Sequence, residues 1–367
     1  AVVMPTRKLV TSYAQDLERF PDLWHKIGLC FGVTILLLFP FMANSYWLTI
    51  VNQSFIAVIG SIALMILTGF AGQISLGHAA FLGIGAYTVA ILGSRFHIPF
   101  WLALPIAGII ASLVGLLIGP FALRLRGLYL AIVTLGLLFL TEHILMSFPD
   151  YTGGVSGLSV PTHLGFTKIE GEGRLGSFSK PSELFGVRIL FAHKLYVILG
   201  VLALASAFLC SNIRRSTLGR SMMAVRDSDL AASVIGVNPA VSKIAAFGIS
   251  SFLAGIAGGA FALQQQYITI VPPFDLSLSI RFITMIVLGG VGTTFGAVAG
   301  ALVFIICSPL MEWIGSHLPL INKLTNAQQS TLLFSFLVCV ILIYEPFGLY
   351  GVWLKVKRYF LTWPFRY

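Results

Sequence analysis

Long apolar runs separated by short polar segments dominate this chain. A transmembrane helix needs about 20 mostly apolar residues to cross about 30 Å of hydrocarbon. Runs of this kind predict ten spans, at residues 27–43, 47–69, 78–94, 98–121, 128–147, 195–213, 243–265, 276–291, 294–313 and 331–349. They do not alternate in polarity as barrel strands would. The pattern therefore predicts an all-α, polytopic transmembrane helical bundle.

The basic residues predict how this bundle is oriented, because Lys and Arg near span ends favour the cytoplasmic side. With the N-terminus inside, 15 of the 23 Lys and Arg residues fall on the cytoplasmic side and 8 on the other. An odd number of spans would remove this bias. We therefore expect both termini to be cytoplasmic.

The same layout divides the chain into three regions. Residues 1–26 form a cytoplasmic N-terminal segment, 27–350 the integral membrane domain, and 351–367 a cytoplasmic tail. Within the membrane domain, we expect an external loop at 148–193 and a cytoplasmic loop at 214–242. The tail interleaves Lys and Arg with aromatic residues, which is typical of an anchor at the membrane interface.

Composition supports a membrane protein and argues against a nucleic-acid partner. Apolar residues make up 57% of the chain and charged residues 10%, with a mean hydropathy of +0.94. A soluble domain is about a quarter charged. The net charge of +10 comes from short clusters that flank the apolar runs, where they would meet lipid headgroups. The four cysteines form no CxxC pair and no zinc spacing, so no metal site is expected.

Two glycine-rich segments interrupt the apolar runs. Residues 68–78 combine three glycines with Gln73, Ser75 and His78. This segment is either a plain cytoplasmic turn or a broken helix of the kind that marks transport pathways. The second break, at residues 288–294, lacks the preceding strand and following Lys of a phosphate-binding loop.

Ionisable residues are scarce within the predicted spans, and this constrains the mechanism. An ion-coupled carrier is expected to place carboxylates near the bilayer midplane, and the predicted spans have none there. A membrane-embedded enzyme would need His, Asp or Glu clustered at one depth, and no such cluster is found. We therefore expect no catalytic residue, and an energy source in another subunit.

The cytoplasmic loop predicts short helices outside the membrane. Ser216 or Thr217 is placed to cap one helix, and Asp227 and Asp229 to cap another. The helices would share an apolar side flanked by charges, formed by Met222, Met223, Val225, Leu230 and Val234. Such a segment suits a groove in a partner protein, although an interfacial helix without a partner fits the pattern too.

Five motifs, found in this order along the chain, together resemble those of a known protein family. They lie at residues 71–87 (AGQISLGHAAFLGIGAY), 123–135 (LRLRGLYLAIVTL), 152–158 (TGGVSGL), 219–237 and 287–292 (VLGGVG). The chain resembles the permease family of ATP-binding-cassette importers for branched-chain amino acids, and within it the M-type subunit. The first two motifs contain the residues expected along the translocation pathway: Gln73, Ser75, His78, Tyr87, Tyr129 and Thr134.

The resemblance implies a passive, alternating-access path in a bacterial inner membrane. It implies a second homologous permease subunit, two ATP-binding-cassette ATPase subunits and an external, periplasmic substrate-binding protein as partners. This chain would bind no cofactor, since ATP and Mg belong to the ATPases. Related permeases carry urea, short amides or other small acids, so the substrate stays open among these classes, and an ion-coupled amino-acid carrier is the remaining alternative.

The resemblance also assigns the ATPase-coupling residues, which lie in the cytoplasmic loop: Arg220, Arg226, Asp227, Asp229, Ala231, Ala232 and Gly236. The family pattern has Glu before the two alanines, and here Leu230 takes that position beside Asp229. The segment 163–188 is a second departure, and no role is assigned to it.

Overall fold

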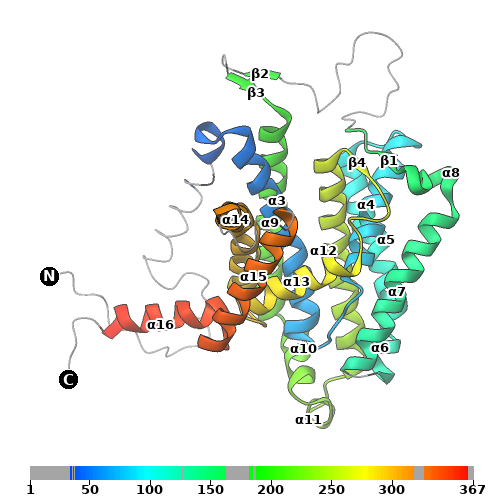
Figure 1. Ribbon diagram of the computed structural model, residues 1–367. Coiled ribbons are helices and arrows are strands. Elements are labelled where there is room, and N and C mark those ends of the chain that lie inside the picture. Colours follow the sequence, from blue (N-terminus) through cyan, green and yellow to red (C-terminus); the bar gives the residue numbers. More distant parts are fainter. Residues whose placement is uncertain are drawn as a thin grey trace.

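The chain folds into a bundle of helices with a few very short strands (Figure 1). The computed structural model describes residues 34, 36, 38–125, 127–162, 182–184, 187–317 and 326–362. The longer helices are α3 (Ser45–Met65), α4 (His78–Ser94), α5 (Phe100–Ile118), α7 (Leu128–Ser147), α9 (Phe191–Arg215), α10 (Thr217–Asp227), α12 (Pro239–Gln265), α13 (Leu276–Gly289), α14 (Thr294–His317), α15 (Asn326–Tyr344) and α16 (Gly348–Thr362). The predicted all-α class is confirmed.

Shorter elements connect these helices. The π-helix η1 (Ile66–Phe70) continues α3, and α6 (Phe121–Arg124), α8 (Pro149–Thr152), the 3-10 turn η2 (Gly154–Ser156) and α11 (Asp229–Val234) lie between longer helices. Strand β1 (Leu158–Ser159) pairs antiparallel with β4 (Tyr267–Ile268), and β2 (Ser182–Leu184) pairs with β3 (Val187–Ile189). The β2–β3 hairpin lies at the opposite end of the bundle from α10 and α11 (Figure 1).

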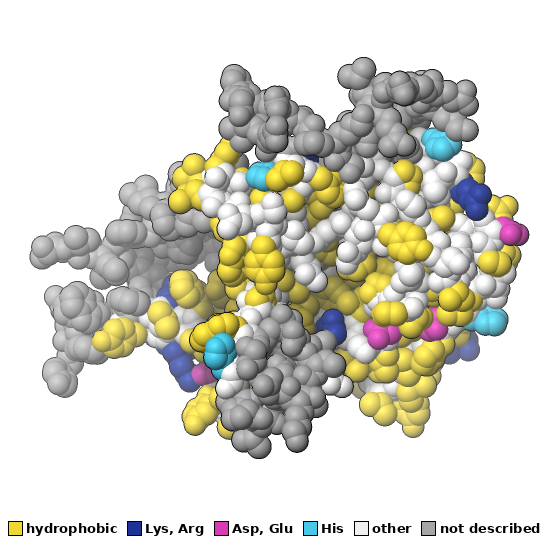
Figure 2. All heavy atoms as spheres, turned by 45° about the horizontal axis from the view of Figure 1, so that its top comes forward, with side chains coloured by type: hydrophobic (Ala, Val, Ile, Leu, Met, Phe, Trp, Pro, Cys, Tyr) yellow, Lys and Arg dark blue, Asp and Glu magenta, His cyan; other side chains and the backbone are white. Residues whose placement is uncertain are grey.

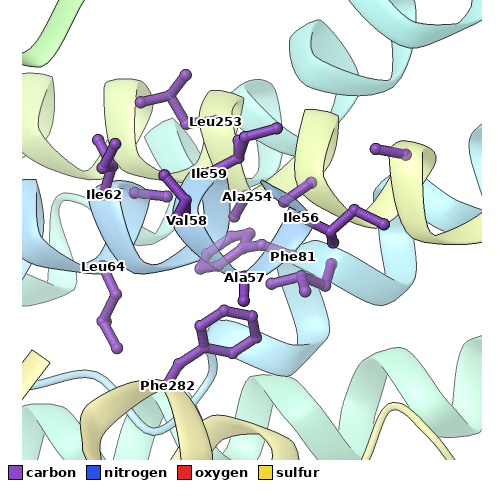
Figure 3. Packing of buried hydrophobic residues seen from close by; sticks show 14 of the residues in the cluster. Ile56, Ala57, Val58, Ile59, Ile62, Leu64, Phe81, Leu253, Ala254 and Phe282 are labelled. Carbon is purple, nitrogen blue, oxygen red and sulfur yellow. The ribbon is translucent and has the colours of Figure 1, made fainter. Parts of the chain in front are cut away.

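Helix α3 forms the centre of the bundle. It contacts α9, α12, α13 and α14, and its apolar stretch is 89% buried. Figure 3 shows Ile59 on α3 near Leu253 and Ala254 of α12, with Phe81 of α4 and Phe282 of α13 on other sides. A helix that is apolar all round must be enclosed by others, which explains its central place.

Glycines allow α12 to pack closely against α4 and α5. A Cβ added to Gly85 would overlap the Gly255 carbonyl, and one added to Gly258 would overlap the Leu82 carbonyl. A Cβ added to Gly115 of α5 would overlap the side-chain hydroxyl of Ser251 on α12. Lipid gives helices no hydrophobic reason to associate, so close backbone packing must hold them together.

The described helices can be compared with the ten predicted spans. Most of the first predicted span, 27–43, lies outside the described residues, and each of the other nine coincides with a helix. Among the described residues, five helices are long and apolar enough to cross a membrane, or up to seven spans are present if each of two bent helix pairs forms one span. Helix α4, at 17 residues, is slightly shorter. The number of spans and their orientation stay predictions.

The outer surface has the character expected in lipid. Figure 2 shows many hydrophobic side chains and few charged ones on the face that it presents. Helices α5, α7 and α9 are only 33%, 22% and 33% buried along their apolar stretches. Exposed apolar residues such as Leu117, Phe139 and Val201 would therefore meet either lipid or another subunit.

The C-terminal part differs in detail from the expectation. The last predicted span runs to residue 349, whereas α15 ends at Tyr344 and α16 begins at Gly348 with a 48° bend. The bend lies at the sequence Glu345-Pro-Phe-Gly348. Pro346 has no backbone N–H and therefore cannot continue a hydrogen-bonded helix. Lys355 pairs with the buried carboxylate of Glu345 and fixes this corner.

The close approach of α12 and α4 generates a stability prediction. Replacing Gly258 by Ala inserts a methyl group against the backbone of Leu82, which cannot move aside as a side chain could. We expect a loss of about 1–3 kcal/mol in stability, seen as a lower apparent Tm of the detergent-solubilised protein. The matched control is Gly136→Ala on α7, where nothing lies within 4 Å of the added atom. Equal Tm values for the two variants would contradict this packing.

Candidate functional site

The first break is largely buried. After η1, residues 71–77 leave the helical conformation, and α4 begins at His78. Gln73 is 5% exposed, while Ser75 and His78 are each 1% exposed. A plain surface turn would expose such polar side chains to water. Irregular backbone inside a membrane protein requires enclosure by protein or a wet cavity, which favours the broken-helix interpretation.

Neighbouring helices satisfy the backbone of this break. Leu76 donates its N–H to Thr134 Oγ1 on α7 at 3.0 Å, and Ala79 donates to Ser279 Oγ on α13 at 3.0 Å. The Ser75 hydroxyl accepts from Gly77 N at 3.3 Å. A Cβ on Gly77 would overlap the Thr134 carbonyl. Small and hydroxylated residues are therefore required here for packing as well as for any pathway.

The predicted pathway residues are only partly brought together. Ser75 and His78 are buried at the start of α4, where Thr134 accepts a hydrogen bond from Leu76 N and the His78 ring lies 5.0 Å from that of Phe282. Tyr87 is buried further along α4 against Phe274, with ring centroids 6.5 Å apart. Tyr129 is 70% exposed on α7, away from this cluster.

The second break meets the first. A Cβ on Gly69 would lie 2.8 Å from the Gly292 backbone, and the chain turns by 119° between α13 and α14 at this point. Two glycine-interrupted segments from separate parts of the sequence thus lie back to back. Paired interruptions of this kind are a recurrent feature of transporter binding sites.

Arg226 joins these breaks to the loop at residues 214–242. It lies near the end of α10, and its Nη1 donates to the Gly69 carbonyl oxygen at 2.7 Å. The π-helical turn leads into non-helical backbone, which leaves this carbonyl without a continuing helix to bond it. A second nitrogen of the same guanidinium lies 2.9 Å from Asp227 Oδ1. Gly292 is also adjacent, since its added Cβ would lie 3.3 Å from Arg226 Nη1.

Helices α10 and α11 of this loop are both capped by serines. Ser216 Oγ accepts from Gly219 N at the start of α10, as predicted. The prediction of Asp227 and Asp229 as caps is wrong, because Ser228 caps α11 by accepting from Ala231 N. Asp229 instead forms a 2.8 Å ion pair with Lys243, and the two side chains are 17% and 9% exposed. This pair fastens α11 to α12.

The apolar residues of the loop do not form the single side that the sequence predicted. Met222 and Val225 of α10 are buried against the bundle. Leu230 and Val234 of α11, with Ile235 after it, are 77%, 86% and 73% exposed. The loop therefore has one apolar side that anchors it and another that faces outward.

The other predicted coupling residues are divided between these surroundings. Arg220 is exposed and donates to the Arg215 carbonyl at 2.6 Å. Ala232 is buried while Ala231 is exposed. Gly236 has φ = 86°, a left-handed conformation that favours glycine, and forms the turn between α11 and α12.

A cleft of about 340 Å³ lies between the first break and the loop. Its lining comes from the break (Ala71, Gly72, Gln73), from the start of α7 and the residues before it (Leu125, Gly127, Leu130), from α10, α11 and the residue between them (Val225, Arg226, Asp227, Ser228, Asp229, Leu230) and from α12 (Lys243). No group of three or more His, Cys, Asp or Glu residues within the described ranges could hold a metal ion.

Sequence reasoning missed several residues of this site. In the sequence, Lys243 is one more basic residue beside a predicted span, yet it forms the ion pair with Asp229. Ser279 is an ordinary residue within a predicted span, yet it accepts the hydrogen bond from Ala79 at the start of α4. Gly69 could have been found from the sequence, because it is one of the three glycines that mark the first break. Its partner Arg226 is 157 residues away, which no local pattern reveals.

Comparisons with known proteins place this architecture in one family. The family described as "Branched-chain amino acid transport system / permease component" matches residues 46–344. The high-affinity branched-chain amino acid transport system permease protein LivM of Salmonella typhimurium is 32% identical over 335 residues, which cover 88% of this chain and 74% of that protein.

Two further relatives agree. LivM of Escherichia coli is 33% identical, covering 84% of this chain and 71% of that protein. A probable branched-chain amino acid transport permease protein, LivH of Methanocaldococcus jannaschii, is 24% identical, covering 76% of this chain and 84% of that protein. No solved structure matches. The family is a transport permease component rather than an enzyme, and this chain belongs to it: it is a member of the branched-chain amino acid transport permease family.

Proposed function

We propose that this chain is the membrane-spanning M-type permease subunit of an ATP-driven importer for branched-chain amino acids. It acts with a second homologous permease, two ATP-binding-cassette ATPases and an external substrate-binding protein, in a bacterial inner membrane. Family membership supports this proposal. The mechanism is supported by two features of the same loop: α11 has an outward-facing apolar side, and Arg226 of α10 is hydrogen-bonded to the first helix break and lies beside the second.

In this proposal, α10 and α11 form the coupling segment, residues 217–236, and lie on the cytoplasmic side with both termini. An ATPase groove covers Leu230, Val234 and Ile235, whose exposed apolar side chains are typical of a protein-interaction site. Closure of the ATPases displaces the coupling segment, and Arg226 passes the displacement to Gly69 and Gly292. The chain itself hydrolyses nothing and binds neither ATP nor Mg.

The proposed pathway follows the first break. Ser75, His78 and Thr134 lie there, and the adjoining α3 is central in the bundle. Moving this break relative to α7 and α13 would open or close a route beside it. Tyr129 has a different place in the proposal, since its exposure on α7 suits contact with the second permease subunit.

The complete proposal is tested by reconstitution. All subunits are expressed together, purified through a tag on this chain, and placed in proteoliposomes. We expect ATPase subunits to copurify and leucine uptake to require ATP and the loaded binding protein, with isoleucine and valine competing and urea and short amides not. Uphill uptake by this chain alone on an ion gradient would contradict the proposal.

The outward side of α11 generates a docking prediction. Replacing Ile235 by Asp puts a charge into the proposed apolar contact, whose burial is worth about 1.5–3 kcal/mol per side chain. We expect ATPase copurification to fall at least about tenfold. The control is Val155→Asp, which is 88% exposed and lies in η2, between α8 and β1; these two elements lie at the other end of the bundle from α11 (Figure 1). Undiminished copurification of the Ile235→Asp variant would exclude α11 as the docking helix.

The Arg226 contact generates a separate prediction about coupling. Arg226→Gln removes a charged hydrogen bond worth about 1.5–3 kcal/mol while leaving the outward side of α11 intact. We expect ATPase subunits to bind normally, with uptake per ATP hydrolysed reduced about tenfold or more. Arg214→Gln, an equal change of charge at the end of α9, is the control. Equal uptake per ATP hydrolysed in the two variants would show that Arg226 does not couple the ATPases to the permease.

A further inference from the structure

Helix α16 has an apolar stripe on its exposed surface. The members of this stripe, Val352, Trp353, Val356 and Tyr359, are 41–54% exposed and occupy positions i, i+1, i+4 and i+7, which share one side of a helix. Figure 1 shows α16 running across the direction of α9 and α12, near the end of the bundle that carries α10. An amphipathic helix that lies across the spans, rather than along them, is placed to lie in the plane of the membrane surface.

The apolar stripe lies on the side of α16 that meets a predicted span. Trp353 stacks on Phe295, with ring centroids 5.6 Å apart, and Tyr350 contacts the same ring at 6.5 Å. Phe295 is the second residue of α14, which coincides with the predicted span 294–313. From this contact α16 leads away from the bundle (Figure 1). The rest of the stripe is therefore placed to meet lipid at the level where α14 enters the membrane.

The charges of α16 are all positive. Residues 348–362 contain Lys355, Lys357 and Arg358 and no acidic residue. Lys355 is paired with Glu345, so one of the three charges is neutralised and two are left. Lys357 and Arg358 are exposed, and long basic side chains beside an apolar stripe reach phospholipid headgroups while the stripe enters the hydrocarbon. Because the headgroups of anionic phospholipids are negatively charged, they complement these two residues, whereas neutral headgroups do not.

The beginning of α16 packs directly on the second helix break. A Cβ added to Gly348 would overlap the Leu288 carbonyl oxygen, and one added to Gly290 would lie 2.7 Å from the Phe347 carbonyl oxygen. Backbone thus contacts backbone, with no flexible side chain between the two segments. Gly292 of the same break lies against the first break. A movement of α16 therefore reaches the point where the two breaks meet.

We propose that α16 is a binding site for anionic phospholipids at the cytoplasmic membrane surface, and that this contact holds the second break in place during transport. Without anionic lipid, α16 is attached only at its beginning, and the second break loses part of its support. A ligand that binds one arrangement better shifts the equilibrium toward it, so anionic lipid favours the coupled arrangement of the two breaks. The lipid contact goes beyond the proposed function, whereas its effect on import rests on that function.

The first experiment measures where α16 lies and needs only this chain. The full-length chain, with its four cysteines replaced, carries a nitroxide spin label at Val356→Cys and is placed in nanodiscs of phosphatidylcholine and phosphatidylglycerol in equal amounts. We expect the label to be accessible to oxygen, which dissolves in hydrocarbon, and shielded from a water-soluble nickel chelate. Val234→Cys on α11, the same replacement at an 86% exposed position, is the control and should show the reverse accessibility.

The second experiment measures the effect of lipid charge on the complete complex in proteoliposomes. Leucine uptake per ATP hydrolysed is expected to be at least about fivefold higher in the equal mixture than in phosphatidylcholine alone, at the lower limit of typical coupling between sites. The double variant Lys357→Gln/Arg358→Gln should lose this gain. Arg214→Gln/Arg215→Gln, which removes the same charge at the end of α9, is the control and should keep it. The comparison of the two lipid mixtures uses the wild-type complex, so it stands even if a variant fails to fold.

The outcomes separate the lipid site from the proposed function. A label at Val356 that the nickel chelate reaches places α16 in water, and a label shielded from both reagents places it against protein; either result overturns the lipid site. Equal uptake per ATP in both lipid mixtures, or an unchanged gain in the double variant, overturns its effect on import. A complex that transports no leucine in either mixture contradicts the proposed function, while the spin-label result still decides the lipid site.

Discussion

The hydrogen bond from Arg226 to the Gly69 carbonyl is the contact on which the other features of the site depend. A backbone carbonyl left open at the end of a membrane helix costs several kcal/mol. The helix α3–η1 can end where it does because the side chain of Arg226, from α10, covers this carbonyl. The same bond places the end of α10 against both helix breaks. A contact needed for folding is thus also positioned to transmit movement.

Transmission requires that the rest of the bundle resist deformation. Glycines bring the backbones of α4 and α12 into direct contact, and α3 is enclosed by four neighbours. Packed interiors of this kind are stiff, so a displacement at one point moves whole elements rather than dissipating locally. The ion pair of Asp229 and Lys243 serves the same purpose at α11, because it fixes this helix to α12. The outward residues Leu230, Val234 and Ile235 are then held on a rigid support.

Much of this architecture could be predicted because apolar length determines where membrane helices form. The run 78–94 coincides with α4, and Ser216 caps α10 as expected. The sequence did not distinguish Ser228 from its acidic neighbours as the cap of α11, since Ser and Asp are both suited to that position. It also grouped Met222 and Val225 with Leu230 and Val234, although a turn between the helices sends the two pairs to opposite surroundings. The exposure of Tyr129 and the burial of Gln73 are set by tertiary packing, which no local sequence pattern predicts.

The most direct test is a distance measurement on the assembled transporter. Spin labels are placed in pairs at three exposed positions in a cysteine-free background: Ile74 in the first break, Thr217 at the start of α10, and Val155 in η2. Helix α8 and strand β1, which flank η2, lie at the opposite end of the bundle from α10 (Figure 1). Pulsed electron paramagnetic resonance compares nucleotide-free and ATP-trapped states. The account predicts that the distance from Ile74 to Thr217 stays constant while the distances of both to Val155 change together. Movement of Thr217 while the distance from Ile74 to Val155 stays fixed would contradict it.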